Sequence, residues 1–279
     1  MKKNAVTVLL GVLYSVLVQA QTPAITQMSP FSSSLKKYEV LDTCRLKITY
    51  QLKIAPDPQK PDYIYKDIRI LEIGKNMAKS YSYLLYQKDS LCTELEAKGA
   101  ESLPALQQTV LPMEVFVSGK DHQTTVIYRA IANAPVYIYT EPTENIRWNI
   151  RDERKEILGY NCQKATATFR GRDYEAWFTT EIPSKYGPYK FVGLPGLILS
   201  IQDSLKEYCW ECIGIKKGNK DMTIKRYKWE YTKITPEKLQ TIISKMYDNP
   251  ILFLQSLGTK IHNLSGKPMT ILYTPLEKF

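Results

Sequence analysis

A strict alternation over positions 46–54 constrains the fold of this chain more than any other sequence feature. Apolar or aromatic side chains fill every even position from Leu46 to Ile54, and Lys, Thr, Gln and Lys stand at the odd positions between them. Successive side chains of a β-strand point to opposite faces, so the pattern predicts a strand with one buried face and one solvated face. A second alternation over residues 145–151, with Ile146, Trp148 and Ile150 as apolar members, predicts another such strand.

Further segments rich in Tyr, Val, Ile and Thr also favour strands. These are residues 63–73, 80–86, 113–117, 124–130 and 136–140. Residues 208–216 and 222–231 flank Gly218-Asn219, and this arrangement predicts a β-hairpin toward the carboxyl end. We therefore expect a mainly β fold, α+β at most, built from a curved antiparallel sheet, an open barrel or a sandwich.

Helix signals are few. Asp89 is placed to cap a short helix over about residues 89–98, which Gly99 would close. Thr235-Pro236 is a cap and first-turn pair, and it predicts a second helix over about residues 236–247. Its apolar face would hold Leu239, Ile242, Ile243 and Met246, and Pro250 would end it.

The amino terminus has the three parts of a secretory signal peptide. Two lysines precede an apolar stretch from Val6 to Val18, and small residues stand at the positions read by a signal peptidase, up to Ala20. The apolar stretch is shorter than the ~20 residues that span a bilayer. We expect residues 1–20 to be removed, and residues 21–279 to form one exported β-rich domain without a transmembrane segment.

The chain is basic. Its net charge of +10 falls to +8 when Lys2 and Lys3 leave with the signal peptide. The densest basic stretch, residues 216–228, also contains Asp221, so we interpret it as the solvated face of the predicted hairpin. A contact with anionic lipid or glycan is the alternative. Export makes nucleic acid an unsuitable partner, and none is predicted.

An odd number of cysteines leaves at least one thiol unpaired within an exported monomer. The five are Cys44, Cys92, Cys162, Cys209 and Cys212. The spacing of the last two resembles a redox motif, but such motifs open a helix, and residues 208–216 are typical of a strand. Residues three apart on a strand face opposite sides. With two histidines and no second CxxC, neither a metal site nor a cofactor is predicted.

Several short motifs follow one another in the middle of the chain. They read GYNCQKA at 159–165, GRDYEAWF at 171–178, EIP at 181–183, GPYKF at 187–191 and GLPGLI at 193–198. Together with LEIG at 71–74, they look like the signature of the GLPGLI family over roughly residues 41–215. This resemblance implies an exported protein of the Bacteroidota, in the periplasm or at the cell surface of a Gram-negative bacterium. It implies no established activity.

The last motif consists of Gly193, Leu194, Pro195, Gly196, Leu197 and Ile198. Residues 194–197 fit a type II turn, with Pro195 at its first corner and Gly196 at the positive φ of the second. Gly193 would allow a close approach of the backbone, and Leu197 would begin a central apolar strand. We expect this turn to set strand register, and the alternative is that it lines a binding cleft.

Residues 170–181 contain the acidic side chains with the best case for catalysis. On a strand, Asp173, Glu175 and Trp177 share one face. Carboxylates two positions apart sit ~6.6 Å from each other at the backbone, near the separation that inverting glycosidases use. A glycan or peptide hydrolase using Asp173, Glu175 or Glu181 is therefore one hypothesis, although nothing in the sequence holds a carboxyl group protonated.

No complete catalytic constellation stands out, and 20 tyrosines provide many aromatic surfaces on predicted strands. We therefore favour a non-catalytic binding or accessory protein of the cell envelope, whose curved sheet takes an apolar, peptide or glycan ligand. The predicted contact residues are Arg172, Tyr174, Trp177, Tyr189 and Lys190. An ion pair for Arg172 and a core position for Trp177 are the alternatives. A structural partner in the envelope, with an exposed apolar patch, is a third hypothesis.

Overall fold

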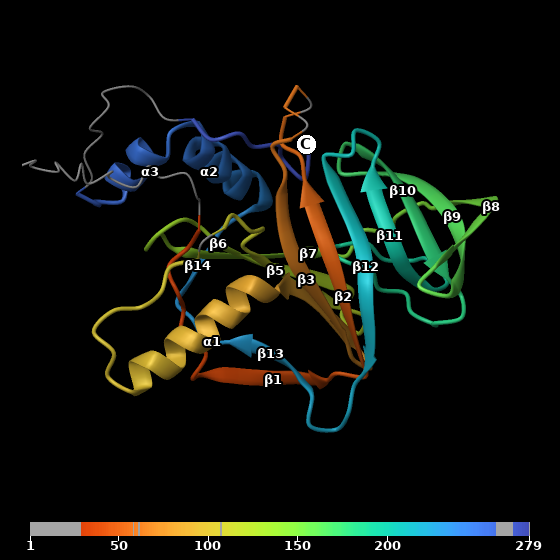
Figure 1. Ribbon diagram of the computed structural model, residues 1–279, viewed down its shortest axis with the longest axis horizontal. Helices are drawn as coiled ribbons and strands as arrows, with labels where there is room; N and C mark the ends of the chain where they lie inside the picture. Colours follow the sequence, from red (N-terminus) through yellow and green to blue (C-terminus); the bar gives the residue numbers. More distant parts are fainter. Residues whose placement is uncertain (1–28, 58, 61, 107, 261–269, 279) are drawn as a thin grey trace, which may run out of the picture.

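The computed structural model describes residues 29–57, 59–60, 62–106, 108–260 and 270–278 (Figure 1). The predicted signal peptide, residues 1–20, lies outside these ranges. No helix within them is long and apolar enough to cross a membrane.

Two sheets and three helices make up the described part of the chain. The strands are β1 (Tyr38–Thr43), β2 (Leu46–Ile54), β3 (Tyr65–Ile73), β4 (Met77–Ser82), β5 (Met113–Ser118), β6 (Gln123–Arg129), β7 (Val136–Pro142), β8 (Asn149–Ile157), β9 (Tyr160–Phe169), β10 (Arg172–Thr179), β11 (Leu197–Asp203), β12 (Tyr208–Lys217), β13 (Thr223–Tyr227) and β14 (Tyr231–Lys233). The helices are α1 (Tyr83–Ala97), α2 (Pro236–Asp248) and α3 (Pro250–Ser256). The predicted mainly β class is confirmed.

The larger sheet has twelve strands in the order β14-β7-β6-β5-β4-β3-β2-β12-β11-β10-β9-β8, and β1 pairs with β13 in the smaller sheet. Its neighbouring strands are antiparallel except β14 and β7, which run parallel. One buried cluster contains residues of β5 and β6, such as Val115 and Val126, together with Ala165 of β9 and Ala176 of β10. Strands from both halves of the sheet therefore curve around a common core, and the sheet stays open between its edges β14 and β8.

The alternation at residues 46–54 is confirmed. Strand β2 lies between β3 and β12, and Ile48, Tyr50, Leu52 and Ile54 are all buried. The second alternation is correct in part, because β8 begins only at Asn149 and its side chains are largely exposed. Its predicted apolar members Ile146 and Trp148 lie before the strand.

The helix predicted near residues 89–98 exists, but its start was wrong. Helix α1 begins at Tyr83, and Ser82 is its cap, with Oγ accepting a hydrogen bond from the Leu85 backbone N–H at 3.3 Å. The strand predicted over residues 80–86 consequently ends at Ser82. Asp89 lies in the middle of the helix, where it forms a buried ion pair with Arg129 of β6. Gly99, at a φ of 76°, follows the end of the helix as predicted.

The predicted helix at 236–247 is confirmed as α2. Thr235 caps it by accepting a hydrogen bond from the Lys238 N–H at 3.4 Å, and its apolar face packs into the core. Pro250 does more than end this helix, because it also stands in the first turn of α3.

The predicted hairpin around Gly218-Asn219 is wrong. Strand β12 pairs with β11 and β2, whereas β13 pairs with β1 in the smaller sheet. The connection passes close to the start of β2, where the Gly218 N–H donates to the Arg45 carbonyl at 2.8 Å. A Cβ at Gly218 would lie 1.9 Å from the Cys44 carbonyl oxygen. This contact directs the chain toward β1 instead of back along β12.

The two glycines of the GLPGLI motif have the opposite roles to those predicted. Gly193 adopts a positive φ of 96°, and Gly196 does not adopt a positive φ, so the predicted type II turn is wrong. A Cβ at Gly196 would lie 2.0 Å from the Thr179 carbonyl oxygen, so this position needs glycine for a close backbone approach. The Leu197 N–H then donates to the Ile182 carbonyl at 3.0 Å, and Leu197 begins β11, which is an interior strand as expected.

Candidate ligand-binding cleft

Strand β10 separates two groups of predicted functional residues. Asp173 is exposed, and Glu175 and Trp177 are half-buried, so these three lie on the outer face of the sheet as the alternation predicted. Arg172 and Tyr174 are buried on the inner face. The five predicted contact residues therefore do not form one surface, because Trp177 lies on the outer side of the strand.

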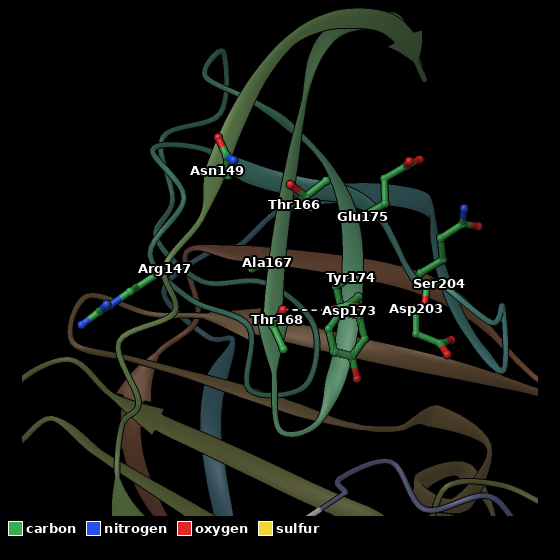
Figure 2. A pocket seen from close by; sticks show the side chains of 11 residues that line it. Arg147, Asn149, Thr166, Ala167, Thr168, Asp173, Tyr174, Glu175, Asp203 and Ser204 are labelled. Carbon is green, nitrogen blue, oxygen red and sulfur yellow. Dashed lines mark hydrogen bonds between the residues drawn. The ribbon is translucent and has the colours of Figure 1, made fainter.

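A cleft of about 550 Å³ lies over the outer face of β8, β9, β10 and β11 (Figure 2). It is lined by Arg147, Asn149, Thr166, Ala167, Thr168, Asp173, Tyr174, Glu175, Gln202, Asp203 and Ser204. The strand register builds this lining, since Asp173 is opposite Thr168 on β9, and Glu175 is opposite both Thr166 on β9 and Gln202 on β11. Hydroxyl, amide and carboxylate groups therefore stand in the lining of the cleft, where they can form hydrogen bonds with a ligand.

Asp173 is held by its neighbour across the strand pair. The Thr168 hydroxyl donates to Oδ1 of Asp173 at 2.5 Å (Figure 2). Both side chains are exposed, so the remaining acceptor sites of the carboxylate face solvent. Asp173 is thus oriented but available to an incoming donor.

Glu175 has more side-chain partners than Asp173. It accepts a hydrogen bond from Nε1 of Trp177 at 2.9 Å and pairs with Nζ of Lys164 at 3.0 Å. Partial burial would raise the pKa of Glu175, but the hydrogen bonds from Lys164 and Trp177 outweigh it and lower that pKa below its usual 4.5. Glu175 is therefore an anion at neutral pH.

Trp177 contacts Glu175 on the outer face of the sheet, but it is not among the residues that line the cleft. Nζ of Lys155 lies over its ring at 4.3 Å from the centroid, and Nζ of Lys164 lies at 5.9 Å. These cation–π contacts hold the indole in place and occupy ring surface that a stacked sugar would otherwise cover.

Glu181 does not join the other two carboxylates. Its side chain accepts a hydrogen bond from the Asn161 backbone N–H at 2.8 Å, at the start of β9. It is not among the residues that line the cleft. The hydrolase hypothesis therefore retains Asp173 and Glu175 as neighbours on one face, without the third acid.

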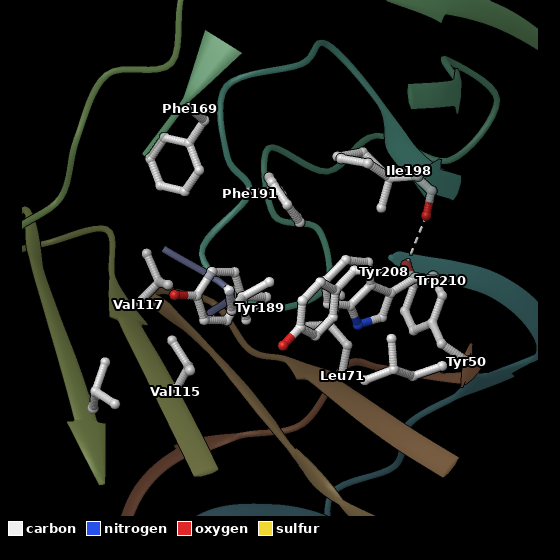
Figure 3. Close-up of a cluster of buried hydrophobic side chains, with 14 of the residues drawn as sticks. Tyr50, Leu71, Val115, Val117, Phe169, Tyr189, Phe191, Ile198, Tyr208 and Trp210 are labelled. Carbon is white, nitrogen blue, oxygen red and sulfur yellow. Dashed lines mark hydrogen bonds between the residues drawn. The ribbon is translucent and has the colours of Figure 1, made fainter. Parts of the chain in front are cut away.

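The other four predicted contact residues meet on the inner side of the sheet. Arg172 pairs with Asp203 at 2.9 Å and with Glu207 at 2.5 Å. Lys190 and Tyr189 are both 4% exposed, and Tyr189 packs edge-on against Phe191 in the aromatic cluster (Figure 3). Tyr174 lines the cleft but turns its ring inward, 4.8 Å from that of Phe191. Arg172 therefore forms buried ion pairs, which was the alternative interpretation of this residue.

Sequence reasoning missed most of the cleft. Asn149, Thr166, Thr168 and Gln202 come from three strands and carry no motif of their own. Only the cross-strand register places them beside Asp173 and Glu175, and register over such distances is not readable from local periodicity.

The cysteines have buried or half-buried positions, and all five are free thiols. Cys209 and Cys212 lie on opposite faces of β12 as predicted, since Cys209 contacts Gln202 on the outer side, whereas Cys212 is buried in the core. In the described ranges no group of three His, Cys, Asp or Glu side chains is close enough together to bind a metal ion.

No curated protein sequence significantly matches this chain. Among solved structures, two crystal forms of PNGF-II each superimpose with a TM-score of 0.46, at 17% and 16% sequence identity. Each match covers 73% of this chain but only 34% or 33% of PNGF-II, so the chain spans about a third of that protein's length. Residues 170–200, which contain β10 and the GLPGLI motif, match the model of a GLPGLI-type family that is described as a protein of unknown function (Porph_ging).

Proposed function

We propose that this chain is an exported cell-envelope protein of the GLPGLI family that binds a hydroxyl-rich ligand, a glycan, in the cleft over β8–β11 without cleaving it. The observation that carries this proposal is the lining of the cleft, where the carboxylates of Asp173 and Glu175 lie among threonine hydroxyls and side-chain amides. The export signal at residues 1–20 and the motifs at 159–198 support the location in the envelope.

The lining favours a glycan over an apolar ligand. Asp173 and Glu175 accept hydrogen bonds, and Asn149 and Gln202 offer both donors and acceptors, which matches the paired donor and acceptor character of sugar hydroxyls. An apolar ligand would instead leave these groups desolvated and unpaired, at a cost of about 1–3 kcal/mol each.

The protonation state of Glu175 supports binding over hydrolysis. A glycosidase needs one carboxyl group with a raised pKa to protonate the leaving group. The pair with Lys164 and the hydrogen bond from Trp177 lower the pKa of Glu175 instead. A carboxylate that stays ionised is a good hydrogen-bond acceptor for sugar hydroxyls and a poor general acid.

Hydrolysis is the second candidate, because Asp173 and Glu175 lie two residues apart in the same cleft. In that case the substrate would have to displace Lys164 from Glu175 to raise its pKa. Incubation with candidate oligosaccharides, followed by chromatography of the products, separates the two functions. Binding without new reducing ends supports the binder, and turnover that Glu175→Gln abolishes supports the hydrolase.

Calorimetric titration with a panel of defined neutral and acidic oligosaccharides tests the binding site. Asp173→Asn and Glu175→Gln should each weaken the binding of a positive oligosaccharide at least tenfold, as expected for lost hydrogen bonds to a charged acceptor. Glu211→Gln is the matched control, because Glu211 is an exposed acid on neighbouring β12 that does not line the cleft. Equal affinities for all three variants would contradict the assignment of the cleft.

A further inference from the structure

A second cavity, of about 310 Å³, lies at the start of the GLPGLI motif. We call it the turn pocket. It is lined by Val117, Ser118, Gly119, His122, Thr143, Glu144, Asn145, Lys185, Tyr186, Val192 and Gly193. These residues come from the end of β5 and the turn after it, from the segment after β7, and from the loop between β10 and β11. None of them lines the cleft over β8–β11, so the turn pocket is separate from the proposed glycan site.

Main-chain hydrogen bonds fix the walls of the turn pocket. The Gly193 N–H donates to the Lys185 carbonyl at 2.9 Å, which closes the loop before the motif. The Thr143 N–H donates to the His122 carbonyl at 2.8 Å, which joins the other two walls. The backbone groups of the walls are thus paired with one another, and a ligand would meet a preformed pocket whose side chains are left to bind it.

The hydroxyl of Tyr186 is an unpaired buried group at this pocket. Tyr186 is 5% exposed, and its hydroxyl has no hydrogen-bond partner among the described residues. Such a group costs about 1–3 kcal/mol in a folded protein, so its presence calls for an explanation. A Cβ at Gly119 would lie 2.4 Å from this hydroxyl, so the polar end of the tyrosine lies against the wall of the pocket. A ligand there can accept the hydrogen bond that the protein leaves unmade.

The ammonium group of Lys185 lies at the same point of the wall. The Cβ at Gly119 would also lie 2.9 Å from Nζ of Lys185, and this Nζ is 5.5 Å from the centroid of the Tyr186 ring. Lys185 is exposed, and its ammonium group has no ion pair or hydrogen bond within the described ranges. Its three N–H donors are therefore available, and an exposed lysine can rotate to admit a ligand to the shielded hydroxyl.

Two more side chains add donors to the lining. His122 and Asn145 are both exposed, and neither side chain makes a hydrogen bond to the described part of the chain. An imidazole ring and a carboxamide can each donate a hydrogen bond. Together with Lys185 and Tyr186, they give the pocket four uncommitted donor groups, one of which carries a positive charge.

The acids near the turn pocket already have partners. Glu144 is the acid of the described lining, and its Oε2 lies 2.7 Å from Nε of Arg170. Asp42 lies within electrostatic range of Tyr186, but it accepts hydrogen bonds from the Thr43 and Asn76 N–H groups at 2.8 Å each. The uncommitted groups of the pocket are therefore donors, whereas its negative charges are compensated within the protein.

We infer that the turn pocket binds one oxyanion group, a carboxylate or a phosphate, between Lys185 and Tyr186. An oxyanion offers several acceptor lone pairs and a negative charge, which match clustered N–H and O–H donors with one free cation. A cavity of about 310 Å³ is near the lower limit of small-molecule sites, so it fits an acid group with one small ring rather than a long chain. The inference goes beyond the proposed glycan binding, because it concerns a different cavity and a different ligand chemistry.

Nuclear magnetic resonance of isotope-labelled histidine tests this inference, since His122 lines the pocket and the chain has only two histidines. The purified chain is titrated with inorganic phosphate, glucuronate or glucose at constant ionic strength, and His122→Asn assigns the resonance. Phosphate or glucuronate should shift the His122 ring signal saturably, and glucose, which lacks the acid group, should not. Saturation by glucuronate alone identifies a carboxylate site, and saturation by phosphate alone identifies a phosphate site.

Two variants locate the bound anion. Tyr186→Phe removes only an unpaired hydroxyl, so it should keep or raise the thermal stability while it weakens the binding of the positive anion at least tenfold. Lys185→Met removes an exposed cation without an ion pair and should also weaken binding at least tenfold. Lys120→Met is the matched control, because Lys120 is an exposed lysine near the same turn that does not line the pocket. Its affinity should equal that of the wild type.

Three results would overturn the inference. The first is no saturable shift with either anion, and the second is glucose binding as tightly as glucuronate. The third is unchanged anion affinity in Tyr186→Phe and Lys185→Met, both of which should remain folded. A lower melting temperature of Tyr186→Phe with unchanged affinity would assign its hydroxyl a structural role and would count against the site in the same way.

Discussion

Lys190 and Glu277 form a buried ion pair, with Nζ 2.6 Å from Oε1, that joins two parts of the chain 87 residues apart. Lys190 also contacts Glu141 of β7 at 2.6 Å, so one ammonium group serves two carboxylates. Three segments distant in the sequence therefore meet at a side chain that is 4% exposed.

Replacing Lys190 should destabilise the fold strongly. Lys190→Met leaves Arg170, at 3.1 and 3.9 Å, as the cation that Glu141 and Glu277 still share. The loss of one partner from a buried pair costs about 3–5 kcal/mol, so we expect a loss toward the lower end of that range. Urea unfolding followed by circular dichroism measures the change. The matched control is Lys53→Met, whose exposed pair with Glu211 at 3.1 Å should contribute less than about 1 kcal/mol. Similar losses of unfolding free energy for Lys190→Met and Lys53→Met would show that the buried ion pairs of Lys190 add no more stability than an exposed pair.

The two motif glycines should respond differently to alanine. Gly196→Ala forces a Cβ against the Thr179 carbonyl and should cost roughly 2 kcal/mol or more, as overpacked positions do. Gly193→Ala meets no atom closer than 3.8 Å and carries only the strain of a positive φ, about 1 kcal/mol. Thermal unfolding of both variants ranks them. A larger loss of stability for Gly193→Ala than for Gly196→Ala would contradict the close backbone approach assigned to Gly196.

The pair between Glu175 and Lys164 should make a small, pH-dependent contribution to stability. The pKa of Glu175 is lowered in the folded state, so its contribution is complete above the unfolded-state value of 4.5 and is lost as pH falls through the lower folded-state pKa. Glu175→Gln should therefore cost less than about 1 kcal/mol at pH 7, because the pair is partly exposed and screened, and nothing at pH 2. Urea unfolding at both pH values checks this. If the stability cost of Glu175→Gln instead increased as the pH fell, the predicted direction of the pH dependence would be contradicted.

The cysteines should react slowly in the folded protein. Burial raises the pKa of Cys44, Cys209 and Cys212 to about 11, against an ordinary value of 9.0. Two pKa units correspond to about a hundredfold less thiolate at pH 8, and the thiolate is the reactive form. Mass spectrometry after brief iodoacetamide treatment should find these thiols unmodified in the native state and modified in urea. Rapid modification of the native Cys209-x-x-Cys212 pair would favour a redox role.

Local patterns predicted the elements that local chemistry determines. The period-two alternation of β2 and the Thr235-Pro236 start of α2 both depend on neighbouring residues, and both are confirmed. The start of α1 was predicted wrongly because an acid that could cap a helix also pairs with Arg129, 40 residues away.

The candidate site was predictable only along a single strand. The shared face of Asp173, Glu175 and Trp177 follows from strand geometry and is confirmed. Their partners Thr166 and Gln202 depend on the register between strands, which no local pattern encodes. An ion pair for Arg172 was among the predicted alternatives, but the partners of Arg172 and Lys190 could not be predicted, since these anions lie far away in the sequence.

Native mass spectrometry of the chain purified from its own host addresses the cleft itself. The wild type should carry a bound species whose mass and fragmentation identify a glycan, and Asp173→Asn should lose it while Glu211→Gln retains it. A bound lipid, or a glycan that Asp173→Asn retains in full, would contradict a hydroxyl-binding cleft over β8–β11.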